Sequence, residues 1–135
     1  NSLIPSYEVD TIANLLKSHG IQDFCIRWGH ETLVQGNRSP KKPWKIVQKI
    51  VTQEPNDKPL DVQINLSNKA ISMIQNHPTQ EHESAPFHIV IDPLTGHLAT
   101  NNFIAAFVFA EDCITARAYA TAFMAKSFLT ASSIV

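Results

Sequence analysis

The sequence has few of the residues that mark several large classes of protein. Only two cysteines occur in 135 residues, Cys25 and Cys113, and they form neither a CxxC pair nor a zinc-like spacing. A disulfide framework would need more cysteines, so we expect both to be buried apolar residues. No run of about eighteen apolar residues exists, and no membrane-spanning helix is therefore predicted.

Neither positive nor negative side chains are in excess. Eleven basic and twelve acidic side chains leave a formal net charge of -1. A nucleic-acid partner is not expected, because phosphate binding needs clustered Lys and Arg, and the short basic run from 38 to 45 is interpreted as a solvated turn. With 44% hydrophobic residues, the chain is typical of one soluble globular domain over residues 1–135.

Hydrophobic periodicity predicts a helix at each end of the chain and strands between them. Apolar residues at helical spacing mark Ser6 to His19, and Gly20 follows as a stop signal. Asp112 can cap a late Ala-rich helix from Cys113 to about Lys126. The predicted strands are Phe24 to Trp28, Thr32 to Val34, Trp44 to Val51, Leu60 to Leu66, Phe87 to Ile91 and Phe103 to Phe109, while Asn68 to Gln75 is ambiguous between strand and helix. This order predicts an α+β fold with a single antiparallel sheet and both helices packed on one face.

Several motifs occur in an order that resembles the ApbE family, the FAD:protein FMN transferases. The clearest is His88-Ile89-Val90-Ile91-Asp92-Pro93-Leu94-Thr95-Gly96, which is similar to the family's HIIDPxTG. The others are Ser6 to Asp10 at a helix start, Ile26 to His30 at a glycine corner, Lys42 to Ile46 at a strand entry, and Ala116 to Phe123 on the late helix. The resemblance covers nearly the whole chain but only the later half of a typical member.

The resemblance implies a T-fold-like layer of sheet and helices, and an enzyme that binds FAD and a divalent metal and transfers FMN to a Thr of another protein. The best catalytic candidates are then His88 and Asp92. The candidate cofactor-binding residues are Asp10, Gly29, Thr95 and Thr121. Family members are commonly exported, which suggests an extracytoplasmic location.

The residues that carry the family's chemistry are replaced here. On the late helix the family has an Asp four residues before the Thr, whereas this chain has Arg117 before Thr121, so no metal is expected. The family's histidine position is Ile89, and His88 would face the other side of its strand. The family's Thr-Ser-Gly is Met73-Ile74-Gln75, and its second glycine is His30, so the phosphate-binding backbone is crowded.

Structural roles are expected for three retained or new charged residues. Asp10 is interpreted as a carboxylate that binds backbone N–H groups or solvent, and Asp92 as a turn-former. Arg117 is expected to form an ion pair, with Asp92 or Glu111 as partner, although an anionic ligand is an alternative. A metal held by His77 and His82 with Glu81 and Glu83 is a further alternative, in a loop that would organise ligands poorly.

Three hypotheses of function follow. The chain is interpreted as a degenerate ApbE-like domain, a non-catalytic interaction or ligand-binding module that needs no cofactor. The alternative is a working flavin transferase, using FAD and magnesium, that another chain completes. The third is an unrelated α+β binding protein. We also expect a homo-oligomer, and a protein partner is possible, because Phe103 to Phe109 and the tail Phe128 to Val135 would otherwise be partly exposed.

Overall fold

The computed structural model describes residues 3–51, 58–75, 90–97, 99 and 103–125. Within these residues one helix precedes six strands and a second helix follows them, which confirms the α+β class. The elements are α1 (Ile4–Ser18), β1 (Phe24–Trp28), β2 (Glu31–Gln35), β3 (Trp44–Ile50), β4 (Leu60–Leu66), β5 (Lys69–Gln75), β6 (Ala105–Ala110) and α2 (Cys113–Ala125). The ambiguous segment after Asn68 is therefore the strand β5.

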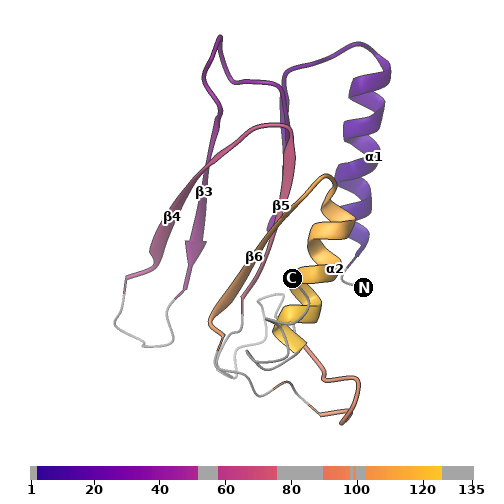
Figure 1. Ribbon diagram of the computed structural model, residues 1–135, viewed down its shortest axis with the longest axis vertical. Coiled ribbons are helices and arrows are strands. Elements are labelled where there is room, and N and C mark those ends of the chain that lie inside the picture. Colours follow the sequence, from indigo (N-terminus) through magenta and orange to yellow (C-terminus); the bar gives the residue numbers. More distant parts are fainter. Residues whose placement is uncertain (1–2, 52–57, 76–89, 98, 100–102, 126–135) are drawn as a thin grey trace.

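The elements form three layers. Four antiparallel strands make the central sheet, in the order β1-β2-β5-β6, and β3 pairs with β4 in a separate two-stranded sheet. Figure 1 shows α1 and α2 on one side of the central sheet and the β3–β4 hairpin on the other side. Both helices thus pack on one face, as predicted, but the prediction of a single sheet is wrong.

The second sheet has a physical cause in the apolar residues on both faces of the central sheet. Leu33 and Ala70 face the helices, whereas their neighbours Val34 and Ile71 belong to a cluster with Ile46 of the hairpin. All four central-sheet residues are almost completely buried. A sheet that is apolar on both faces needs a cover on each, and the hairpin covers the face that the helices leave.

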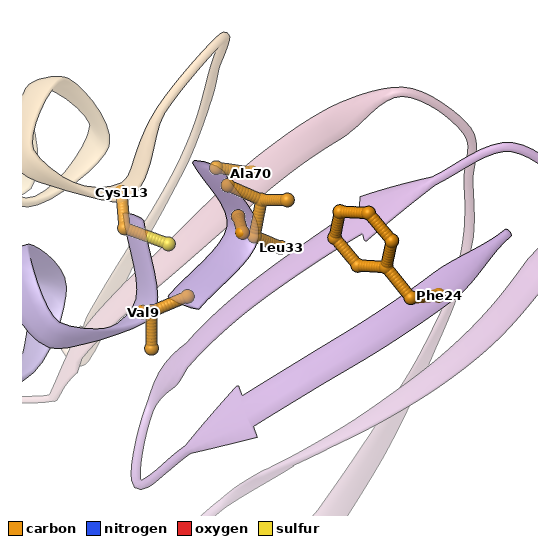
Figure 2. Packing of buried hydrophobic residues seen from close by; sticks show 6 residues of the cluster. Val9, Phe24, Leu33, Ala70 and Cys113 are labelled. Atoms are coloured by element: carbon orange, nitrogen blue, oxygen red, sulfur yellow. The ribbon is translucent and has the colours of Figure 1, made fainter. Parts of the chain in front are cut away.

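The helix side of the sheet contains the larger part of the core. Val9 of α1 and Cys113 of α2 meet Phe24, Leu33 and Ala70 of the strands in one buried cluster, and Figure 2 shows these side chains converging. A second cluster further along α2 contains Ile74, Ala120 and Met124. The two helices also contact each other, so α1 and α2 form a single layer.

The predicted stop of α1 and the predicted cap of α2 are confirmed by their hydrogen bonds, although α1 begins at Ile4 rather than at Ser6. Gly20 has a φ of 77°, and the N–H groups of Gly20 and Ile21 donate to the carbonyls of Lys17 and Leu16 at 3.0 and 3.1 Å. This is a left-handed glycine stop. At the start of α2 the Asp112 carboxylate accepts the Thr115 N–H at 2.7 Å, which is an N-cap.

Three further predictions concern the cysteines, the strand from Phe87 to Ile91 and membrane-spanning helices. Cys113 is buried as expected, but Cys25 is exposed, because β1 is an edge strand and the hairpin does not cover Cys25. Of the predicted strand from Phe87 to Ile91, only 90 and 91 lie within the described residues. No helix in the described part of the chain is both long and apolar enough to cross a bilayer.

Candidate functional site

The most unusual side chain in the core is Arg117, which points from α2 into the sheet. It is 2% exposed, and its Nη1 lies 3.2 Å from Oε1 of Glu31, which is 3% exposed. The same Nη1 donates to the carbonyl oxygen of Met73 at 3.3 Å. Arg117 therefore forms the predicted structural ion pair, but the predicted partners were wrong: Glu111 pairs with Lys69 at the surface at 3.1 Å.

Glu31 was not identified from the sequence. It opens β2 directly opposite Ser72 of β5, and the Ser72 hydroxyl donates to Glu31 Oε1 at 3.0 Å. Burial is the main influence on this carboxyl and raises the pKa of Glu31, while Ser72 and Arg117 oppose that rise. The predicted strand begins at Thr32, one residue after Glu31, so the prediction gives Glu31 no place in the sheet.

The surroundings of Arg117 do not fit a divalent metal. Burial lowers the pKa of Arg117, but Glu31 opposes that change and keeps the guanidinium charged beside the carboxylate. The cation occupies the place where the resemblance requires an acidic ligand. The Thr121 hydroxyl, the retained candidate ligand, donates to the Arg117 carbonyl at 2.8 Å and so bonds its own helix. Within the described ranges, no group of three or more His, Cys, Asp or Glu residues is placed to hold a metal.

Asp10 of α1 lies at the beginning of α2. Its two carboxylate oxygens accept the N–H groups of Cys113 and Ile114 at 2.8 and 2.9 Å. A carboxylate at a helix N-terminus satisfies free N–H donors and interacts favourably with the helix dipole. This geometry agrees with the backbone-binding interpretation of Asp10. A contact between Asp10 and a cofactor remains a prediction.

Asp92 and Thr95 lie together in a turn that their own backbone stabilises. The Asp92 carboxylate accepts the Leu94 N–H at 2.9 Å, and the Gly96 N–H donates to the Asp92 carbonyl at 2.8 Å. Thr95 Oγ1 accepts the His97 N–H at 3.3 Å. Asp92 is thus the turn-former that the sequence indicates. The catalytic candidate His88, its neighbour Ile89 and the histidines His77 and His82 lie outside the described residues.

The positions that resemble the family's phosphate-binding backbone are filled by side chains. Met73 and Ile74 are buried in the core. The Gln75 carboxamide accepts the Val51 N–H at 3.2 Å and donates back to the Val51 carbonyl, which joins the central sheet to the hairpin. Met73, Ile74 and Gln75 are therefore engaged in the core and in bonds to the hairpin, and they do not line an open phosphate-binding site.

The glycine corner between β1 and β2 is only half retained. Gly29 has a φ of 59°, which the turn requires, and a Cβ added there would meet nothing within 4 Å. At His30, burial lowers the pKa of the imidazole, and the positive charges of Arg117 and Arg27 lower it further. His30 thus adds an imidazole side chain at the position where the family has a second glycine.

Comparison with known proteins agrees with this fold and these motifs. The sequence model of the ApbE family matches residues 1–134, and the chain belongs to the ApbE family. Among curated proteins, it is 26% identical over 127 residues to the FAD:protein FMN transferase of Vibrio cholerae serotype O1 (strain ATCC 39541 / Classical Ogawa 395 / O395). That alignment covers 92% of this chain and 37% of the relative.

Two solved structures have the same fold. The flavin transferase ApbE from Vibrio cholerae superposes with a TM-score of 0.77 at 22% identity, over 96% of this chain and 40% of that one. The apo form of the flavinyl transferase ApbE from Pseudomonas stutzeri gives a TM-score of 0.70 at 20% identity, over 94% and 38% of the two chains. The chain therefore spans about two fifths of the length of these relatives.

Proposed function

We propose that this chain is an ApbE-like domain that has lost flavin transfer and acts as an interaction or ligand-binding module. The observation that carries the proposal is the Arg117–Glu31 pair. Transfer of a phosphoryl-linked group needs a cation that contacts the reacting phosphates. Here the cation at the corresponding helix position is a buried guanidinium that already contacts Glu31 and the Met73 carbonyl.

Two further features support the proposal. The Gln75 carboxamide bonds the backbone of Val51, so it occupies space that a phosphate cradle would leave open. The corner between β1 and β2 carries His30 in place of the family's second glycine, and its side chain crowds the backbone that would approach a phosphate. One replacement alone would fit a change of specificity. The combined loss of an acidic ligand, a second glycine and a small-residue cradle favours loss of the reaction.

The direct test is a flavin-transfer assay. The purified chain is incubated with FAD, magnesium and an acceptor protein that carries a target Thr, and covalent FMN is detected by in-gel fluorescence. We expect no labelling, while an active ApbE-family transferase labels the same acceptor in a parallel reaction. Labelling of the acceptor by this chain would overturn the proposal.

The alternative is an FAD:protein FMN transferase that another chain completes. It is supported by family membership, because the curated relative that the chain matches is an FAD:protein FMN transferase. Flavin absorbance separates the two proposals. A working half-site should show a perturbed flavin spectrum when FAD and magnesium are added, whereas the non-catalytic domain should leave the spectrum of free FAD unchanged.

A further inference from the structure

An apolar groove opens between α1 and β1 at one edge of the central sheet. The groove has a volume of about 400 Å3, and its lining includes Tyr7 and Ile12 of α1 and Ile26 and Trp28 of β1. Tyr7 is 62% exposed and Trp28 is 60% exposed. Two large aromatic side chains that remain mostly in water, beside further apolar residues, are typical of an interaction surface.

The strand that borders this groove also has a free hydrogen-bonding edge. Among the described strands, β1 pairs only with β2, through a two-residue turn at Gly29 and His30. Residues that flank such a turn bond across the hairpin, and the pattern then alternates. The N–H and C=O groups of Cys25 and Arg27 therefore point away from β2. A free edge of this kind is a template for another strand.

We infer that β1 pairs with β1 of a second copy of this chain, antiparallel and about a twofold axis at Ile26. This pairing joins the two central sheets into one continuous sheet. It goes beyond the proposed function and does not depend on whether the chain transfers flavin. A strand is the occupant that satisfies both the free backbone groups and the apolar groove.

The register follows from the residues of β1. With the axis at Ile26, the whole strand is paired and the outward backbone groups of Cys25 meet those of Arg27 in the second copy. An axis at Arg27 would place two guanidinium groups opposite each other, which is unfavourable. An axis at Cys25 would place Arg27 and Trp28 opposite Asp23 and Gln22, which lie outside β1, so part of the strand would lack a strand partner.

The helix layer fits the same axis. Ile12 and Leu15 of α1 are 45% and 56% exposed, and α1 lies over β1 and β2 at this end of the layer. Extending the sheet through β1 brings the α1 helices of the two copies toward each other across the groove. Apolar residues on both the helix and the strand can thus contribute to the roughly 1,200 Å2 that a stable interface buries.

This surface differs from the one predicted from the sequence. The segment Phe103 to Phe109 includes most of β6, the opposite edge of the central sheet. Within it, Ile104 and Phe109 are 47% and 48% exposed. What distinguishes the β1 edge is the apolar groove that α1 and β1 form together, which makes it the better candidate for a two-layer interface. The predicted tail Phe128 to Val135 lies outside the described residues.

The register can be tested with an engineered disulfide. In the proposed dimer, Cys25 of one copy lies opposite residue 27 of the other, and the α-carbons of such a hydrogen-bonded pair are about 5.5 Å apart, within reach of a disulfide. Arg27→Cys should therefore form a covalent dimer under mild oxidation with the native Cys25. The matched control is Cys25→Ser/Arg27→Cys, which places cysteine opposite serine and should not cross-link.

A second variant tests the interface without a covalent bond. Arg27→Pro removes the outward N–H of Arg27 but keeps the hydrogen bonds between β1 and β2. Sedimentation should show a dimer for the wild type at tens of micromolar. The dimer of the variant should dissociate about thirtyfold more readily, because it loses two hydrogen bonds of roughly 1 kcal/mol each. The far-UV circular dichroism spectrum should be unchanged.

Several results would overturn the inference. These are a wild type that is monomeric at tens of micromolar, a dimer that Arg27→Pro leaves intact, and cross-linking of Cys25→Ser/Arg27→Cys at the wrong register. A monomer whose β1 edge instead binds an extended apolar peptide would also contradict it. None of these measurements uses flavin, so failure here is distinguishable from failure of the proposed function.

Discussion

The guanidinium of Arg117 and the carboxylate of Glu31 lie 3.2 Å apart, with 2% and 3% of their side chains exposed. A charge pair at this depth loses much of its hydration on folding, and the attraction between the partners offsets that cost only while both are present. The pair links α2 to β2, and the Met73 carbonyl extends the link to β5. It therefore makes three elements of the fold depend on one electrostatic contact.

Removing one partner of this pair should lower the free energy of unfolding more than removing both. Arg117→Met leaves the Glu31 carboxylate buried without its cation, and we expect it to lower the free energy of unfolding by about 3–5 kcal/mol. The double variant Glu31→Gln/Arg117→Met should recover much of this loss. Urea unfolding of the wild type, both single variants and the double variant gives the coupling. Additive losses would contradict the pairing.

Glu31 should give stability a specific pH dependence. Burial raises the pKa of Glu31 above its ordinary value of 4.5, so the folded protein binds this proton more tightly than the unfolded chain does. As pH rises from 4.5 toward the raised pKa, the free energy of unfolding therefore falls. Glu31→Gln has no such proton. Unfolding measured across this window should show the wild type losing stability relative to Glu31→Gln, and parallel curves would contradict the raised pKa.

Asp10 should stabilise the protein through the helix that it caps. Asp10→Ala leaves the N–H groups of Cys113 and Ile114 without their acceptor, and we expect a loss of about 1–2 kcal/mol in the free energy of unfolding. Asp112→Ala is a matched comparison, because Asp112 accepts only the Thr115 N–H among the bonds described above. Asp10→Ala should have a lower melting temperature than Asp112→Ala. The opposite order would contradict the greater role of Asp10.

The Cys113 thiol should report on global unfolding. Burial raises the pKa of Cys113 strongly, and the nearby Asp10 carboxylate raises it further, so little thiolate forms in the folded protein. In a Cys25→Ser background, we expect thiol reagents to modify Cys113 only as fast as the protein opens. The labelling rate should increase with urea in parallel with unfolding. Fast labelling in native buffer would show that the α1–α2 contact opens locally.

The sequence predicts the elements well because their signals are local. Gly20 ends α1 and Asp112 caps α2 through contacts within a few residues, and both were identified from residue type and position. The second sheet was missed because Val34 and Ile71 need a cover from the distant residue Ile46, and a strand pattern does not identify which element supplies that cover.

The same limit applies to the site. The replacement of an acidic residue by Arg117 is visible in the sequence once the family motif is aligned. Its partner is not, because Glu31 lies 86 positions away and follows a turn, where a carboxylate normally faces solvent. Only the antiparallel pairing of β2 with β5 brings Glu31 beside Ser72 and below α2. Long-range strand pairing decides which charged residues meet, and residue type alone does not predict that pairing.

The contact between Asp10 and the start of α2 has a consequence for biosynthesis. Its two partners are separated by 103 positions, so the Asp10 carboxylate meets the N–H groups of α2 only after all the residues between them have been made. Loop closure over such a distance is slow compared with the formation of a helix or hairpin. We therefore expect α1 and the β1–β2 hairpin to emerge from the ribosome without a stable core, and the domain to fold only when α2 becomes available.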